Sequence, residues 1–129
     1  AACEAVIQET VKYVKQRTAF GKTIADFQHT QFKLAELEAE VTVMRVFIDR
    51  CAELLVKKEL STVEASKAKL LATELQGKVT DQCVQMHGGY GYMWEYPVAR
   101  AYADARVQRI YGGTSEVMKL IIGRDLLAD

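Results

Sequence analysis

Three short segments of the 129-residue sequence combine glycines with polar and aromatic residues in a way that suits ligand binding. The first is RTAFGKTIADFQ, residues 17–28, in which an arginine stands close to Phe20 and Gly21. A guanidinium group binds phosphate through paired hydrogen bonds, and a neighbouring ring can cover a flat group. The alternative is a surface Arg17 with Phe20 filling the end of a helical bundle, and the local sequence leaves both interpretations open.

The second segment, residues 85–104, reads QMHGGYGYMWEYPVARAYAD. Its glycines, Gly88, Gly89 and Gly91, permit the backbone to approach a ligand closely, although they equally well end a helix. This is not the dinucleotide-binding fingerprint, because the glycines follow a predicted helix and no strand precedes them. His87 is typical of a histidine satisfied at a helix end, and no second histidine or carboxylate pair completes a metal set with it. We therefore predict no metal site.

The third segment is IYGGTSE, residues 110–116. Two glycines precede a Thr-Ser pair that is typical of a helix start, so several amide groups are free to bind a ligand oxygen. An ordinary loop between two helices is an equally good local interpretation.

Composition narrows the class of protein. The length fits one domain, and 17 basic residues balance 17 acidic ones. A net charge of zero argues against a protein that binds nucleic acid or a membrane surface electrostatically. No apolar run approaches the ~20 residues of a membrane span, so we predict no membrane insertion.

The cysteines and the first residues indicate the compartment. Cys3, Cys51 and Cys83 lie far apart without a CxxC motif, which favours reduced, buried thiols over a disulfide framework or a zinc site. The start, AACEAVIQETVKYVKQR, has acidic residues where a signal peptide has an apolar core. It is typical of a helix already under way. We predict a protein of a reducing compartment that is not secreted.

Long helices must position the three segments, because the chain has one proline and most of its glycines lie in two clusters. Ser61 and Glu64 have the spacing of a capping box, and Pro97 suits the first turn of a helix. Thr114 or Ser115 can cap the last helix. The expected helices cover residues 1–16, 27–58, 61–87, 97–107 and 115–127. No stretch alternates long enough to predict a strand.

An apolar seam marks the second helix, with rows of residues that recur every seven positions. The rows are Phe27, Leu34, Val41, Ile48 and Leu55, and Leu37, Met44 and Cys51. On the third helix we expect the inward positions to be Ala65, Ala68, Leu71 or Leu75, Val79 and Cys83. The predicted fold class is all-α, an up-and-down four-helix-type bundle with an extra C-terminal helix.

Taken together, the three segments resemble the C-terminal domain of acyl-CoA dehydrogenases over nearly the whole chain, residues 1–129. RxxFG at residues 17–21, followed by Gln28, resembles the flavin-binding turn of that family, and YGGTSE is similar to its active-site loop. The family's second sequence signature is matched at Gln85, Gly88, Gly89, Gly91, Glu95, Arg100 and Asp104. YMWEYP and YGGT most resemble the long-chain enzymes. The resemblance implies an N-terminal helical domain and a middle β domain that this sequence lacks.

The resemblance also implies FAD as the cofactor and gives roles to particular residues. Arg17 would meet the flavin pyrophosphate, Phe20 would pack near the cofactor, and Gln28 would hold the dinucleotide of a neighbouring subunit. The adenosine side of a flavin across a subunit interface would be lined by Gln85, Met86, His87, Gly88 and Gly89. The flavin of the same subunit would be touched by Thr114, Ser115 and Glu116. The substrate thioester would be bordered by Tyr111, Gly112 and Gly113.

The implied reaction is α,β-dehydrogenation of an acyl-CoA thioester in fatty-acid or branched-chain oxidation. The backbone amide at Gly112 would stabilise the developing enolate. Many relatives carry the catalytic glutamate at the position of Gly112, and a glycine cannot be a base. In the long-chain and isovaleryl branches that glutamate belongs to the first helix of the domain, at a position that falls about two helical turns before Ala1. We expect no catalytic residue in this chain and no activity from it alone.

The resemblance further implies a homotetramer joined through its helical bundles, and an electron-transfer flavoprotein as acceptor. Three other functions stay open: a helical assembly module, an enzyme-inactive paralogue, and an oxidase-like relative that passes electrons to oxygen. Assembly alone requires none of the polar details of RxxFG, QxxGG and YGGTSE, and this difference favours the dehydrogenase.

Overall fold

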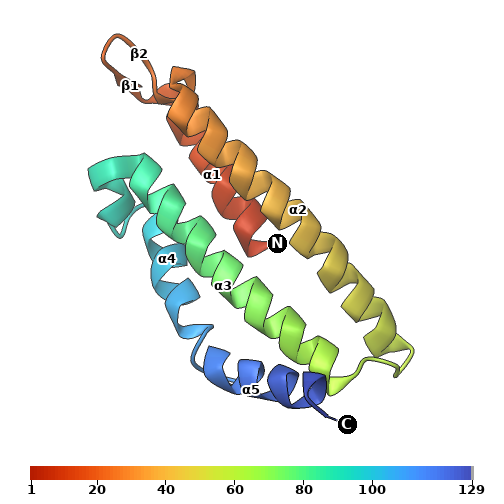
Figure 1. Cartoon of the computed structure of the whole chain (residues 1–129). Helices are drawn as coiled ribbons and strands as arrows, with labels where there is room; N and C mark the ends of the chain where they lie inside the picture. The colour runs from red at the N-terminus through yellow and green to blue at the C-terminus, as the bar shows by residue number, and fades with distance from the viewer. Residues whose placement is uncertain (129) are drawn as a thin grey trace.

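In the computed structural model, which describes residues 1–128, five α-helices follow one another with short connections (Figure 1). The bounds are α1 Ala2–Gln16, α2 Gln28–Val56, α3 Thr62–His87, α4 Pro97–Val107 and α5 Ser115–Leu126. Two 3-10 turns, η1 Ile24–Asp26 and η2 Gly88–Tyr92, precede α2 and follow α3. Every helix expected from the sequence is therefore present, within about two residues at each end.

Local hydrogen bonds explain where the helices start. The Ser61 hydroxyl accepts from the Glu64 amide at 3.1 Å, and the Glu64 carboxylate accepts from the Ser61 amide at 3.3 Å. The predicted capping box is thus confirmed. Pro97 occupies the first turn of α4, and Thr114 rather than Ser115 caps α5 by accepting from the Val117 amide at 3.3 Å.

A small hairpin that the sequence did not predict joins α1 to α2. Its strands, β1 Thr18–Ala19 and β2 Lys22–Thr23, have two residues each, too few for an alternating pattern to be visible. Phe20 and Gly21 form the turn with φ of 54° and 78°, as tight hairpins require. The Phe20 side chain is 96% exposed, so the interpretation in which it fills the end of the bundle is wrong.

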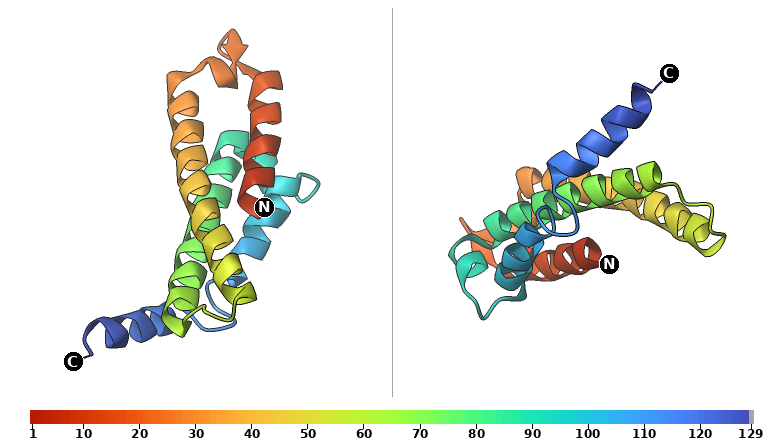
Figure 2. Two further views of the ribbon diagram at one scale, coloured as in Figure 1. Left: turned by 90° about the vertical axis from the view of Figure 1, so that its right-hand side faces the viewer. Right: turned by 90° about the horizontal axis from the view of Figure 1, so that it is seen from below.

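Helices α1 to α4 alternate in direction, which confirms the up-and-down bundle. In Figures 1 and 2, α1 and α3 run one way and α2 and α4 the other, while α5 crosses the first half of α3 and projects from the bundle. Helix α3 packs against each of the other four helices. The core is centred on α3. The buried apolar residues of this core come from four helices and are Ile7, Leu37, Val41, Leu75, Val79, Cys83 and Val98.

The predicted apolar seam of α2 is not buried along its whole length. Leu37, Val41 and Cys51 are buried, whereas Leu55 is 65% exposed. The prediction for Leu55 is wrong, and at this end of α2 the neighbouring Leu54 is buried instead.

On α3 the structure chooses between the two leucines that the sequence left open. Leu75 is buried, while Leu71 is half exposed. Ala65, which we expected to face inward, is exposed. In the first turns of α3 the buried residues are Ser66 and Ala68, so the prediction is confirmed for Ala68 and wrong for Ala65.

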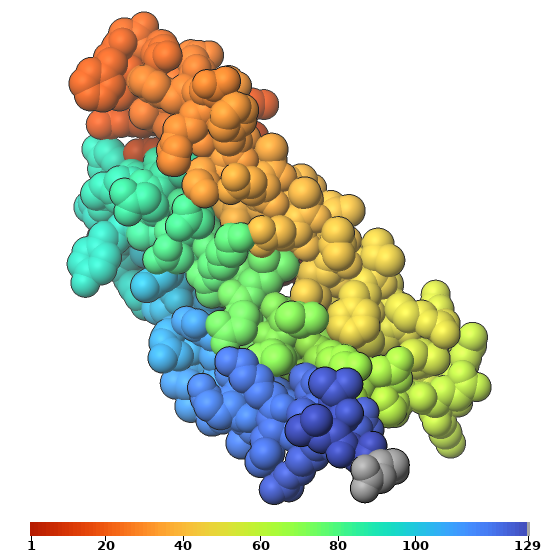
Figure 3. Space-filling view, in the orientation of Figure 1, coloured from red at the N-terminus to blue at the C-terminus, as the bar shows by residue number. Residues whose placement is uncertain are grey.

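The bundle is therefore thick at one end and thin at the other. Helix α2 is about 43 Å long, whereas α1 is about 22 Å long. Alongside the start of α1, Val43, Val46 and Leu71 stay exposed, and Leu55 is exposed at the thin end. Figure 3 shows the outer faces of α2 and α5 at this end. Among residues 1–128, no helix is long and apolar enough to cross a membrane.

Replacing Val79 with alanine should lower the free energy of unfolding by about 2 kcal/mol, because Val79 is fully buried and its methyl groups leave a cavity. The matched control is Val43→Ala, on a side chain that is 72% exposed. It makes the same change in helix propensity, and we expect less than about 0.5 kcal/mol. Urea denaturation followed by circular dichroism measures both, and equal effects would contradict the assigned core.

Candidate functional site

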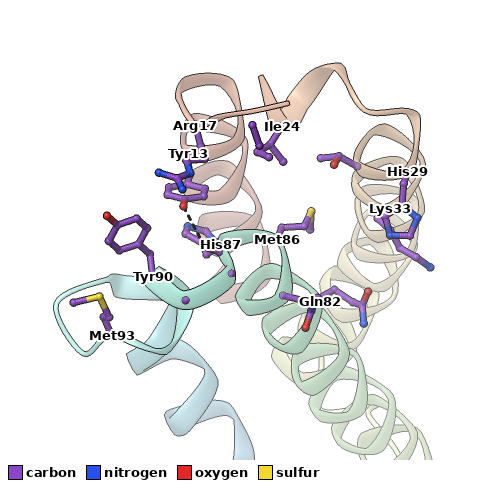
Figure 4. Close-up of a pocket in the computed structure, with 15 residues that line it drawn as sticks. Tyr13, Arg17, Ile24, His29, Lys33, Gln82, Met86, His87, Tyr90 and Met93 are labelled. Atoms are coloured by element: carbon purple, nitrogen blue, oxygen red, sulfur yellow. Dashed lines mark hydrogen bonds between the residues drawn. The ribbon is translucent and has the colours of Figure 1, made fainter. Parts of the chain in front are cut away.

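A pocket opens where the end of α1, the start of α2 and the end of α3 meet (Figure 4). Helix α1 contributes Tyr13, and Arg17 directly follows the end of this helix. Helix α2 contributes His29 and Lys33, which lie one turn apart on the same face. The end of α3 and residues 88–93 supply most of the remaining wall, namely Gln82, Gln85, Met86, His87, Gly88, Gly89, Tyr90 and Met93. Ala19, Ile24 and Thr30 complete it. Six of the predicted cofactor contacts, Arg17 and residues 85–89, therefore lie together.

The charges around this pocket favour an anionic ligand. Its lining contains Arg17, His29 and Lys33, and no carboxylate from the described residues. The guanidinium of Arg17 lies 5.6 Å from the centre of the Tyr90 ring, and Lys33 forms an exposed ion pair of 3.0 Å with Glu36. An arginine held over an aromatic ring presents its donors in a fixed plane, which suits a phosphate group.

Aromatic packing fixes the floor of the pocket. The rings of Tyr13 and His87 stack with centroids 4.2 Å apart, and the Tyr13 hydroxyl donates to the His87 carbonyl at 3.1 Å. The His87 Nδ1 lies 2.8 Å from the carbonyl of Cys83, one turn earlier in α3. Burial lowers the pKa of His87, and the Cys83 carbonyl opposes this shift. His87 is therefore a neutral, buried histidine satisfied at its helix end, as the sequence indicated.

A close backbone contact folds η2 back against α3. A side chain at Gly91 would place its Cβ only 2.4 Å from the carbonyl oxygen of Val84. Only glycine fits this position. Gly88 ends α3 with φ of 60°, so the chain reverses there and Tyr90 reaches the pocket.

The third predicted segment lies elsewhere, between α4 and α5. Gly112 and Gly113 have φ of 62° and 97°, and a Cβ on Gly113 would lie 2.5 Å from the terminal methyl of Met118. The loop is held from α3. The Ser115 hydroxyl donates to Glu74 Oε1 at 2.6 Å, Arg109 Nη1 donates to Glu74 Oε2 at 3.1 Å, and the Lys69 ammonium donates to the Gly113 carbonyl.

The two groups of predicted residues stand apart along α3. Glu74, which holds the loop, and Gln85, which lines the pocket, are 11 residues apart on one helix, or about 16 Å. Thr114, Ser115 and Glu116 share a shallow polar hollow with Glu74 and Arg109. No pocket formed by residues 1–128 contains both groups.

Two predicted cofactor contacts lie outside both the pocket and the loop. Phe20 lies at the tip of the hairpin, where its ring packs edge-on against Phe27 with centroids 6.4 Å apart. Gln28 begins α2 with an exposed side chain. Both face away from the body of the chain, a placement that a contact with a neighbouring subunit would require.

Sequence reasoning missed the residues that reach these sites from elsewhere in the fold. They are Tyr13, His29, Lys33, Gln82 and Tyr90 at the pocket, and Lys69, Glu74 and Arg109 at the loop. One signal was present, because a glycine inside a helix often marks a close approach. Gly77 is such a residue, and the Arg109 guanidinium lies against it. In the part of the chain that the structure describes, no three His, Cys, Asp or Glu residues gather as a metal site would need.

Comparisons with known proteins agree with this arrangement. The family model for the acyl-CoA dehydrogenase C-terminal domain matches residues 1–127, and the chain therefore belongs to that family. It is 56% identical over 128 residues to the mitochondrial long-chain specific acyl-CoA dehydrogenase of Rattus norvegicus, a match that covers 99% of this chain and 30% of the relative. The resemblance inferred from the motifs is confirmed, including its long-chain character.

Solved structures share the fold closely. An acyl-CoA dehydrogenase from Geobacillus kaustophilus superposes with a TM-score of 0.95 at 46% identity, over 98% of this chain and 33% of that one. A glutaryl-CoA dehydrogenase from Mycobacterium smegmatis in complex with FADH2 superposes with a TM-score of 0.94 at 25% identity, over 99% of this chain and 33% of that one. The chain thus spans about a third of the length of the relatives it matches.

The buried His87 should make stability depend on pH. Its folded-state pKa lies below the unfolded value of about 6.5, so the unfolded state binds the extra proton. The stability contributed by the neutral ring is complete above that value and is lost as the pH falls below it. We expect the free energy of unfolding to decrease from pH 7 to about pH 5.5.

Urea titrations at several pH values measure this dependence. His87→Gln should flatten it, while the control His29→Gln, on an exposed side chain of α2, should leave it as in the unsubstituted chain. The same slope in both variants would show that His87 does not carry the effect.

Proposed function

We propose that this chain is the C-terminal domain of a flavin-dependent acyl-CoA dehydrogenase that introduces an α,β double bond into acyl-CoA thioesters. One observation carries the proposal. This member of the family has both a cationic pocket and a separate glycine loop. The substrates belong to fatty-acid or branched-chain oxidation. The rat relative is mitochondrial by name, and a mitochondrial matrix or bacterial cytoplasmic location goes with the proposal.

The pocket residues fit the dinucleotide part of FAD. Arg17 supplies a cation for the pyrophosphate, and no carboxylate in the lining opposes it. The backbone at Gly88 and Gly89 and the side chains of Gln85 and Met86 offer polar and apolar contacts for an adenosine group. When bound, FAD supplies the hydride acceptor for the reaction.

The separation of the two sites supports an assembly in which each chain contacts two cofactors. About 16 Å along α3 separates the pocket from the loop, so residues 85–89 serve a flavin shared with a neighbouring subunit. Thr114, Ser115 and Glu116 serve the flavin of their own subunit. Phe20 at the tip of the hairpin and Gln28 at the start of α2 are both exposed, so another subunit can reach them.

The loop residues Tyr111, Gly112 and Gly113 border the thioester. The amide of Gly112 has no acceptor within residues 1–128, so it is free to donate to the thioester carbonyl oxygen as negative charge develops there. This is a backbone function, and glycine performs it while permitting the positive φ that the loop requires.

The catalytic base lies outside this chain in our proposal. Gly112 cannot take a proton, and the carboxylates near the loop are acids of lowered pKa. The hydrogen bond from Ser115, together with Arg109, lowers the pKa of Glu74. Hydrogen bonds to its own backbone amide and to Thr114 lower the pKa of Glu116. Neither is raised toward neutrality as an effective base would be, so the glutamate upstream of Ala1 fills this role.

The exposed apolar face of α2 and α3 supports assembly into a homotetramer through the bundles. Val43 and Leu71 are exposed on it and line one groove between the two helices, and apolar patches of this kind typically mark protein contacts. An electron-transfer flavoprotein is the proposed electron acceptor of the complete enzyme.

Anaerobic titration of the intact gene product with acyl-CoA thioesters tests the proposed function. We expect the flavin absorbance to bleach, because hydride transfer reduces the cofactor, and the chain length that bleaches best will define the substrate. The isolated 129-residue chain should neither retain flavin nor react. A bound flavin that no thioester bleaches would contradict the proposal and indicate an inactive paralogue.

Replacing Arg17 with glutamine should weaken flavin binding to the intact protein by about tenfold or more, because a charge-assisted hydrogen bond to phosphate is lost. Lys15→Gln is the matched control, since it removes an exposed positive charge from the last turn of the same helix. Flavin released on dilution, followed by fluorescence, measures both. Equal retention in the two variants would remove Arg17 from the cofactor site.

A further inference from the structure

One carboxylate holds both ends of the loop between α4 and α5. Glu74 lies in the middle of α3 and accepts from two residues, with Arg109 bound to Oε2 at 3.1 Å and Ser115 bound to Oε1 at 2.6 Å. Arg109 directly precedes residues 110–114, and Ser115 directly follows them. The two oxygens of a single side chain therefore set the span of the loop.

Two further contacts complete this arrangement. The amide of Ser115 donates to the carbonyl of Arg109 at 3.2 Å, which closes the base of the loop. The Lys69 ammonium, also on α3, donates to the carbonyl of Gly113. The loop is thus attached at its start, its end and one internal carbonyl, and the side chains that attach it belong to α3.

The loop needs such anchors because its own residues restrict it little. Gly112 and Gly113 have positive φ and no side chain, and a Cβ built on Gly112 would meet no atom within 4 Å. Glycine populates many backbone conformations with similar ease. The direction in which the Gly112 amide points is therefore decided by the residues that hold the ends of the loop.

Two features of this arrangement are unfavourable for stability. The Nε of Arg109 is buried without a hydrogen-bond partner, which natural proteins generally avoid. The guanidinium also lies against Gly77, where a Cβ would come within 3.3 Å of the Arg109 Cζ, and a glycine inside a helix weakens that helix. Features that cost stability in this way typically serve a function.

We propose that Glu74 is a positioning residue that, through Arg109 and Ser115, aims the Gly112 amide at the thioester carbonyl oxygen. This inference rests on the proposed dehydrogenase function. Glu74 does not touch the substrate. It acts by fixing the backbone donor before the substrate binds, so that no rearrangement is needed as charge develops on the oxygen.

The test uses Glu74→Gln in the intact gene product. The amide oxygen still accepts from Ser115, but the negative charge that holds Arg109 is gone. Because a small misplacement of a catalytic donor is costly, single-turnover flavin bleaching should slow by about tenfold to a hundredfold. The dissociation constant of the thioester should change by less than about threefold, since most of the ligand is bound elsewhere.

A second readout separates positioning from general damage to the fold. Isotope-edited infrared spectroscopy of a bound thioester labelled at the carbonyl carbon reports how strongly that oxygen is hydrogen-bonded. In the unsubstituted protein the carbonyl stretch should lie below its value in solution, and Glu74→Gln should move it back toward that value. A loss of stability alone would leave the stretch of the folded fraction unchanged.

Glu40→Gln is the matched control. The carboxylate of Glu40 accepts from Lys78 of α3 at 2.5 Å, so this substitution also removes an ion pair that joins α3 to another helix. It does not touch the loop, and it should leave the bleaching rate and the carbonyl stretch unchanged. Arg109→Gln should reproduce the effects of Glu74→Gln, and the double variant should be no worse than either, since both act through one contact.

If Glu74→Gln fails to fold, Gly77→Ala provides a second test of the inference. It displaces the Arg109 guanidinium by a few tenths of an ångström while favouring the helix, and should shift the carbonyl stretch in the same direction by a smaller amount. An unsubstituted protein that bleaches normally, with Glu74→Gln indistinguishable from Glu40→Gln, would overturn this inference alone. A flavin-bound unsubstituted protein that never bleaches would overturn the proposed function and this inference with it.

Discussion

The packing of α3 against every other helix is the interaction on which the rest of the structure depends. Its buried row of Leu75, Val79 and Cys83 meets α1, α2 and α4 on one side, while α5 crosses its first half. Hydrophobic burial has no direction of its own, so a central helix that contacts all the others is what fixes their relative positions. A cavity in this row would disturb the cationic pocket and the loop together.

The same helix sets the distance between the two candidate sites. Its end, from Gln85 to His87, forms a wall of the cationic pocket, and its middle, at Glu74, holds the glycine loop. A hydrogen-bonded helix keeps such a spacing far better than a loop could. Both candidate sites are attached to one rigid helix, so their flexible glycine segments keep their positions. This explains why so many of the side chains that hold these segments belong to α3.

The outer surface of α2 and α3 has a different character. These helices expose several apolar side chains, among them Val43 and Leu71, and the chain spans about a third of the length of its relatives. A domain with an unfinished core is suited to complete that core with other chains or domains. The exposed face and the separation of the pocket from the loop both support the proposal that the site is assembled from more than one subunit.

By itself, the sequence determined the helices, their caps and the glycine turns, because these depend on residues within a few positions of one another. The Ser61 cap and Pro97 start are examples. The sequence also determined the family, because the three motifs occur together in one chain. Only the tertiary structure decided that Leu75 and not Leu71 is buried, that Phe20 is exposed, and that Glu74 meets Arg109 and Ser115. These outcomes join residues that are far apart in the chain, and helical periodicity does not encode which neighbour a given face will meet.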